Sequence, residues 1–294
     1  MIIVTGTKRS GTSMWMQLLK AAGFPPIGSA FPRNWESTIK DANAAGFYES
    51  DLRGGIFYGT NPHPKNGAYL FPEATRRHAV KVFIPGLIKT DRAFIDKVVA
   101  TVRPWRPYVR SVNRLYELER EANKSKLEKV PYDIPEPVFM PPLIEWWVEN
   151  FSLISDIVTR RYPFYMVAYE SVLEDPDKTL RDVFRWLGEG DVEASIACVD
   201  PALRTQGEKV DDQVEKSDLE PEVTEVFDAL YETVRTQTPL EQTFIDRLNE
   251  TNRLLGPRIE AAVKQTARAQ LERKRLVDAH RKKRSEAQEN SELP

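Results

Sequence analysis

The chain begins with a short apolar segment that leads into a loop rich in glycine, hydroxyl and basic residues. The segment is Met1-Ile2-Ile3-Val4, and the loop reads Thr5-Gly6-Thr7-Lys8-Arg9-Ser10-Gly11-Thr12-Ser13 before a run of apolar helix formers. β-Branched residues favour a strand, glycines let the backbone approach an anion closely, and a helix N-terminus carries partial positive charge. The pattern therefore predicts a strand, a phosphate-binding loop and a helix, which is the opening of an α/β fold.

The loop departs from the P-loop motif G-x-x-x-x-G-K-[ST] at one important position. Gly6 and Gly11 have the spacing of the two motif glycines, but Thr12 stands where a lysine would hold the β and γ phosphates. The cations Lys8 and Arg9 lie earlier, inside the loop. No later apolar strand ends in a plain aspartate suited to magnesium. These departures argue against a nucleoside triphosphatase.

Composition narrows the function classes further. The 294 residues carry a formal net charge of −2, which indicates neither a nucleic-acid partner nor a membrane surface. The single cysteine, Cys198, excludes an internal disulfide and a multi-cysteine metal cluster, and the three histidines are far apart in the sequence. With no signal peptide and no apolar run of roughly 18 residues, we expect a cytoplasmic protein without a bound metal.

Strands and helices are expected to alternate along the first two thirds of the chain. The expected strands after the first are residues 79–84, 96–102 and 164–169, and the expected helices are near residues 109–123, 143–160 and 176–187. This alternation predicts a mostly parallel sheet with helices on both faces. Ligands of such sheets bind beyond the carboxyl ends of the strands.

The C-terminal third is expected to be helical and increasingly basic. Helices are predicted from about Val223 to Val234 and from about Pro239 to Leu255, with Thr238 as N-cap of the second. Residues 258–284 contain ten basic residues against three acidic ones. We therefore predict an α/β domain over residues 1–256 and a helical or disordered basic extension over residues 257–294. The extension is either a solvated helix or a segment that docks to an acidic partner or an anionic lipid.

A second anion site is predicted where the strand at 96–102 ends. Arg103 follows this strand, and Ser111 lies eight positions later in the next helix. A guanidinium and a hydroxyl at this spacing can converge on a phosphate. Because Arg103 and the glycine loop both follow strand ends, we expect them to meet at one ligand.

In these segments the chain resembles the sulfotransferases that use 3′-phosphoadenosine 5′-phosphosulfate (PAPS). Residues 9–13 match the Lys/Arg-Ser-Gly-Thr-Ser/Thr loop of that family, and Arg103 and Ser111 match its arginine and serine for the 3′-phosphate. Residues 169–176, Tyr-Glu-Ser-Val-Leu-Glu-Asp-Pro, are similar to a segment of the bacterial branches. The resemblance covers roughly residues 1 to 190, and we identify no family motif in the C-terminal third.

The resemblance implies a P-loop-like α/β fold and transfer of a sulfuryl group from PAPS to a hydroxyl or amine of a small-molecule or glycan acceptor, without a metal. It implies that Arg9 neutralises the charge of the leaving phosphate. A weaker correspondence suggests Arg204 in place of a basic loop near the family's C-terminus. The residues implied to bind PAPS are Lys8, Arg9, Ser10, Gly11, Thr12, Ser13, Arg103, Ser111 and Arg204.

The general base is less clearly marked. Well-known members have a histidine after the second strand, where this chain reads Lys81-Val82-Phe83-Ile84-Pro85. The segment Gly46-Phe47-Tyr48-Glu49 is similar to a bacterial Gly-Tyr/Phe-x-Glu segment and suggests Glu49, with His63 as the second candidate and Glu36 and Asp51 after it. Trp15 is one position away from the family's adenine-binding tryptophan, so it is expected to face the core.

Two other functions remain open from the sequence. One is a P-loop kinase or nucleotidase, which would need the missing lysine and a magnesium ligand. The other is a non-catalytic relative that binds the nucleotide, or a partner through its basic extension. The proline-rich and aromatic segments at residues 24–71 and 131–142 would suit an aromatic alcohol or a sugar as acceptor.

Overall fold

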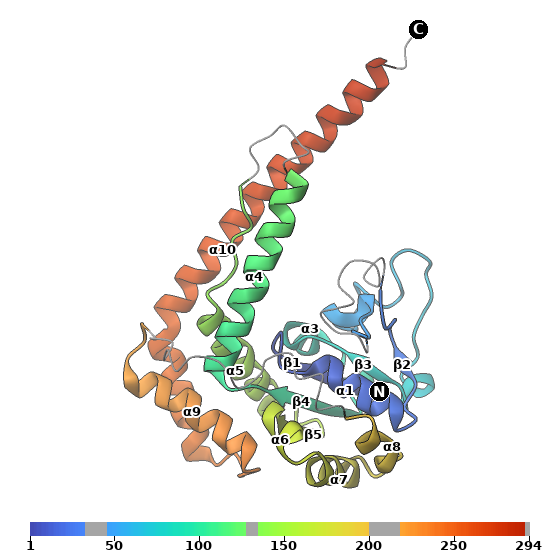
Figure 1. Cartoon of the computed structure of the whole chain (residues 1–294), viewed down its shortest axis with the longest axis vertical. Coiled ribbons are helices and arrows are strands. Elements are labelled where there is room, and N and C mark those ends of the chain that lie inside the picture. The colour runs from blue at the N-terminus through green and yellow to red at the C-terminus, as the bar shows by residue number, and fades with distance from the viewer. Residues whose placement is uncertain (33–45, 128–134, 200–217, 292–294) are drawn as a thin grey trace.

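A sheet of five parallel strands forms the centre of the molecule in the computed structural model, which describes residues 1–32, 46–127, 135–199 and 218–291. The strand order is β2-β3-β1-β4-β5, and every pairing is parallel (Figure 1). The strands are β1 (Ile2–Gly6), β2 (Pro26–Ile27), β3 (Ala79–Lys81), β4 (Lys97–Val102) and β5 (Phe164–Ala168). The predicted α/β fold class is confirmed.

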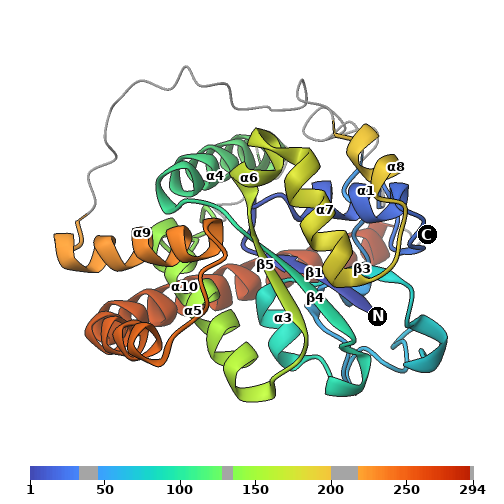
Figure 2. The ribbon, with the colours of Figure 1, turned by 90° about the horizontal axis from the view of Figure 1, so that it is seen from below.

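Helices cover both faces of the sheet, because β1 and β4 are apolar on both sides. In β1, Ile3 packs into one core while Ile2 and Val4 pack into the other. The first core lies under α3 (Ile84–Lys89), α4 (Trp105–Leu127), α5 (Pro142–Arg160) and α9 (Pro221–Arg235). The second lies under α1 (Thr12–Ala21), α7 (Pro176–Leu187) and α8 (Val192–Ala197), on the opposite side (Figure 2).

Short elements connect the strands to these layers. The helix α6 (Tyr169–Glu174) follows β5 directly, and 3₁₀ turns occur at η2 (Asp51–Gly54), η3 (Glu73–Thr75) and η4 (Arg92–Phe94). The strand predicted at residues 79–84 is shorter than expected, because β3 ends at Lys81 and α3 begins at Ile84. Pro85 in the first turn explains the difference, since proline has no amide to donate to a sheet but is accepted at a helix start.

The C-terminal helix also differs from its prediction. It is one element, α10 (Gln242–Ser291), which runs through Pro257 (Figure 1). It begins after Pro239, and the Thr238 hydroxyl shares a hydrogen bond with Thr236 instead of capping it. The predicted boundary at residues 256/257 therefore lies inside a continuous helix, and the division into two domains stays a prediction. Within the described part of the chain, no helix is long and apolar enough to cross a membrane.

Candidate phosphate-binding site

The loop after β1 lies at the point where the strand order of the sheet reverses. β1 is paired with β3 on one side and with β4 on the other, so the connections diverge from its carboxyl end. Such a point in a parallel sheet leaves a crevice at the strand ends. The loop therefore has Lys81 at the end of β3 on one side and Arg103, just beyond β4, on the other.

Two glycines give the loop its shape. Gly11 is the N-cap of α1 with φ +94°, and a Cβ there would lie 2.5 Å from a ring carbon of Tyr169. A Cβ at Gly6 would lie 2.5 Å from the Ser10 hydroxyl oxygen. A side chain at Gly11 would have to displace the ring of Tyr169, and one at Gly6 would also clash with the Thr101 carbonyl oxygen. The loop thus needs glycine for close approach as well as for its left-handed backbone.

Internal hydrogen bonds hold the loop in this conformation. The Ser10 hydroxyl donates to the Thr7 carbonyl at 2.6 Å, and the Thr101 hydroxyl on β4 donates to the Ser10 carbonyl at 2.7 Å. Ser10 is thereby used to build the loop. The Thr7 hydroxyl is buried and has no hydrogen-bond partner among the described residues.

The structure brings Arg9, Arg103 and Ser111 together beside this loop. Arg9 Nε donates to Ser111 Oγ at 3.3 Å, and Arg103 Nη1 donates to the Arg9 carbonyl at 3.1 Å. Burial lowers the pKa of Arg103, and the nearby Tyr169 and Glu170 oppose that shift. Two guanidinium groups and a hydroxyl therefore gather at one place, as the sequence predicts. That they bind phosphate stays a prediction.

Lys8 turns away from this group toward α5. Its Nζ lies 2.7 Å from Glu145 Oε1 and 3.3 Å from the Tyr116 hydroxyl. Burial opposes the charged form, but the ion pair with Glu145 raises the pKa of Lys8 above its usual value. The charge of Lys8 is thus already partly balanced by a carboxylate.

Glu49 lies in a buried ion-pair network on the other side of the loop. Its Oε1 is 3.0 Å from Lys81 Nζ, and its Oε2 is 2.8 Å from Arg53 Nη1. Lys81 Nζ also donates to Ser13 Oγ at 3.1 Å. Burial lowers the pKa of Lys81, and Glu49 opposes that shift. Sequence reasoning missed Lys81 as a site residue, although a lysine at the end of a buried strand was a usable signal.

The remaining predicted residues are placed as follows. His63 Nε2 lies 3.7 Å from Asp51 Oδ2, so these two candidate bases contact each other. Thr12 is buried as the first residue of α1. Trp15 is fully buried in the core beneath α1, which confirms the expectation that it does not present a surface for adenine. Arg204 and Glu36 lie outside the described residues.

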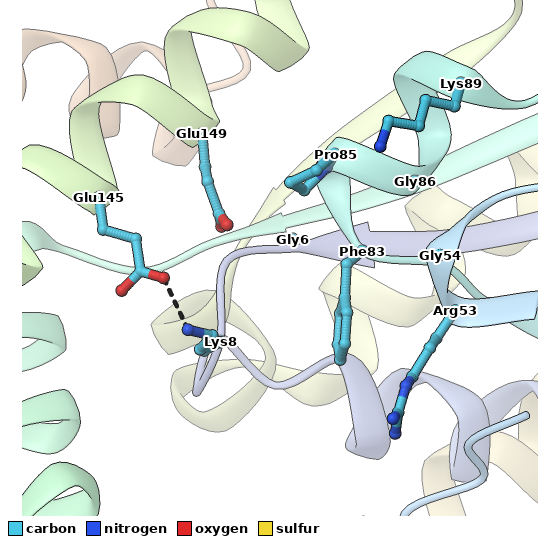
Figure 3. Close-up of a pocket in the computed structure, with 10 residues that line it drawn as sticks. All are labelled: Gly6, Lys8, Arg53, Gly54, Phe83, Pro85, Gly86, Lys89, Glu145 and Glu149. Carbon is cyan, nitrogen blue, oxygen red and sulfur yellow. Dashed lines mark hydrogen bonds and ion pairs between the residues drawn. The ribbon is translucent and has the colours of Figure 1, made fainter. Parts of the chain in front are cut away.

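A cavity of about 310 Å³ adjoins the loop on the Lys8 side (Figure 3). It lies between the loop, η2, α3 and α5. Sequence reasoning missed the two glutamates of α5 in its wall, and their four-residue spacing on an expected helix was the only available signal. The lining residues are Gly6, Lys8, Arg53, Gly54, Phe83, Pro85, Gly86, Lys89, Glu145 and Glu149.

The chain is similar to two bacterial proteins of known structure. One is the sulfotransferase STF1 from Mycobacterium tuberculosis, with 18% identity, a TM-score of 0.41 and coverage of 67% of this chain and 69% of that one. The other is the sulfotransferase domain of the Synechococcus olefin synthase, with 16% identity, a TM-score of 0.39 and coverage of 82% and 95%. No family model and no curated protein matches the chain. A likeness at this level carries no argument about activity, which depends on the residues of the site.

Proposed function

We propose that the chain is a sulfotransferase that moves a sulfuryl group from PAPS to a hydroxyl or amine of a small-molecule or glycan acceptor. The observation that carries the proposal is the convergence of Arg9, Arg103 and Ser111 beside the glycine loop. A ligand with phosphate groups at two positions matches this arrangement, since the loop and the arginine pair offer two anion sites at one edge of the sheet. The single cysteine is consistent with work in a reducing cytoplasm.

The residues of the site fit the two phosphate groups of PAPS. The N-terminus of α1 offers N–H groups that have no partner within the helix. Gly6 and Gly11 let the loop before this helix pack closely against Thr101 and Tyr169. This part would hold the 5′-phosphosulfate, with Thr7, Thr12 and Ser13 as further donors. Arg103 and Ser111 would hold the 3′-phosphate through charge-assisted hydrogen bonds.

Sulfuryl transfer resembles phosphoryl transfer in its demands on the protein. Charge develops on the oxygen that leaves with the nucleotide, so cations placed there in advance lower the barrier. Arg9 is one such cation. Lys81 is a second, because its ammonium group already contacts Ser13 of the loop. In this scheme Glu49 keeps Lys81 and Arg53 in place, and it acts as a base only by giving up an ion pair.

The experiment that tests the proposal compares adenosine 3′,5′-bisphosphate with ADP in thermal unfolding. We expect the bisphosphate to raise Tm more than ADP does, because only the bisphosphate has a 3′-phosphate for Arg103 and Ser111. Arg103→Ala should abolish the difference, with a loss of about 1.5 to 3 kcal/mol of binding free energy. Each shift is referred to the Tm of the same variant without ligand, since Arg103 is buried.

Arg106→Ala is the matched control. Arg106 lies one turn away on α4 and pairs with Asp228 on the surface at 2.8 Å, so its loss should leave the preference unchanged. Equal stabilisation of the wild-type chain by ADP would contradict the 3′-phosphate assignment. Magnesium-dependent turnover of ATP would favour a kinase instead. Bisphosphate binding with no transfer to any acceptor would favour a non-catalytic relative.

A further inference from the structure

Two glutamates of α5 face the cavity beside the loop, and only one of them is paired. Glu145 binds Lys8 and also accepts hydrogen bonds from Tyr116 at 2.8 Å and Tyr108 at 3.3 Å. Glu149, one turn later, has no hydrogen bond or ion pair with any residue that the structure describes. Its carboxyl group points into the cavity toward the loop (Figure 3). A half-buried carboxyl group without a partner loses part of its hydration, so its ionised form is costly.

The surroundings of Glu149 explain how it is tolerated. Burial and, to a smaller extent, Glu145 on the same helix raise its pKa to about 8, against the opposing effect of Lys8 on the loop. The other charged groups that line the cavity are Arg53 of η2 and Lys89 of α3. Glu149 therefore carries a proton at neutral pH and can exchange it near the pH at which enzymes work.

The rest of the cavity wall suits an acceptor molecule. Phe83 and Pro85 provide an apolar side, while Gly6 and Lys8 belong to the loop proposed to hold PAPS. A volume of about 310 Å³ is within the range of small-ligand sites. A flat alcohol such as a phenol could lie against Phe83 with its hydroxyl between the loop and Glu149.

We propose that this cavity binds the acceptor and that Glu149 takes the proton of the acceptor hydroxyl. The acceptor O–H bond breaks and its proton passes to a carboxylate oxygen of Glu149, while the acceptor oxygen forms a bond to sulfur. The bond between sulfur and the 5′-phosphate oxygen breaks, and its electron pair stays on the leaving phosphate. This role rests on the proposed function. Glu49 is a poorer proton acceptor, since both of its oxygens are held by cations.

The first test measures transfer from PAPS to 2-naphthol as formation of adenosine 3′,5′-bisphosphate, from about pH 6 to about pH 9. The wild-type kcat/KM should rise with pH and level off above about pH 8. In Glu149→Gln the rise of kcat/KM with pH should be absent, and kcat/KM should be roughly 10²- to 10⁴-fold lower than in the wild-type chain. The Tm shift with bisphosphate should remain. Glu49→Gln should keep the step. Glu225→Gln, a change of an exposed glutamate on α9, is the neutral control.

A second readout needs no turnover. The pKa of Glu149 is raised in the folded chain from 4.5 to about 8. Protonation of Glu149 therefore contributes to the free energy of unfolding, and this contribution is fully present below about pH 4.5. That stability is lost as pH rises through about 8. Glu149→Gln should therefore have a higher Tm than the wild-type chain at about pH 9, with a flatter dependence on pH.

These outcomes separate the two proposals. A pH step that persists in Glu149→Gln, or that disappears in Glu49→Gln alone, would overturn the role of Glu149. Bisphosphate binding by a wild-type chain that transfers to neither 2-naphthol nor water would overturn it as well. Failure of the bisphosphate to stabilise the chain would instead overturn the proposed function, and the pH dependence of Tm would still report whether the pKa of Glu149 is raised.

Discussion

Gly11 shows how a single residue controls the shape of the loop between β1 and α1. It has φ +94°, and the space where a Cβ would lie is filled by the ring of Tyr169. Gly23 has nearly the same backbone, φ +90°, but nothing lies within 4 Å of its Cβ position. A comparison of alanine substitutions at these two glycines therefore separates two losses of unfolding free energy. One comes from the left-handed backbone, and the other comes from the clash with Tyr169.

We expect Gly11→Ala to destabilise the fold more than Gly23→Ala does. In both variants the free energy of unfolding should fall by roughly 1 to 2 kcal/mol, because alanine is strained in the left-handed conformation. Only Gly11→Ala must also displace Tyr169. Urea unfolding measures the difference, and the Tm shift with adenosine 3′,5′-bisphosphate should shrink for Gly11→Ala alone. Equal losses at the two positions would show that the contact with Tyr169 is relieved at no cost.

Some site residues were readable from the sequence and others were not. Gly6, Gly11 and Arg9 belong to one contiguous pattern, so local rules were enough to find them. No motif in the sequence around Glu149 distinguishes it from the other glutamates of the chain. Its position beside the loop depends on how α5 packs on the sheet, about 140 residues after the loop. Periodicity identified that helix but not which side chain would remain unpaired.

At the scale of secondary-structure elements, the candidate site is built from residues at the carboxyl ends of neighbouring strands. Lys81 ends β3 and binds Glu49, while Arg103 follows β4 and binds the carbonyl of Arg9, so each neighbouring strand supports one side of the loop. The strand positions were predictable from apolar runs. The early end of β3 was not, because Val82, Phe83 and Ile84 are good strand residues and only the proline in the first turn of α3 shortens the strand.

The α10 helix allows a prediction about where the folded part of the chain ends. Leu255 is 3% exposed and Ala262 is 7% exposed, and Ile259 packs on the core, whereas Val263 and Leu271 are exposed. A chain that ends after Arg268 should keep its Tm within a few degrees. One that ends after Gly256 loses the packing of Ile259 and Ala262 and should be less stable by roughly 2 to 3 kcal/mol.

Thermal unfolding of the two shortened chains, with and without the bisphosphate, provides the comparison. If the chain ending after Gly256 were as stable as the full chain, the boundary predicted from the change in charge would be the physical one. If the chain ending after Arg268 were strongly destabilised, the basic end of α10 would pack on the rest of the molecule. Loss of binding to an acidic partner or to anionic vesicles without loss of Tm would support a docking role for residues 269–294.

At the scale of the whole molecule, the parallel sheet explains why distant segments form one site. β1 lies in the middle of the strand order, and its neighbours come from positions about 80 and 100 residues later. Alternating strands and helices made this class of fold predictable, and the rule that ligands bind beyond the strand ends predicts where the candidate site lies. The order of the strands, and hence which side of the loop receives Lys81 and which receives Arg103, came only from the structure.

This arrangement predicts a footprint of the nucleotide on the whole chain. Adenosine 3′,5′-bisphosphate should slow hydrogen exchange in two separate segments, the loop and first turn of α1 and the first turns of α4, because it contacts both sides of the β1 end. ADP should protect the first segment more than the second, since it lacks the 3′-phosphate. Amides of α10 beyond residue 268 should exchange equally with and without ligand. Protection there, or equal protection of the loop and of α4 by ADP, would mean that the two anion sites are not divided between the loop and the segment from Arg103 to α4.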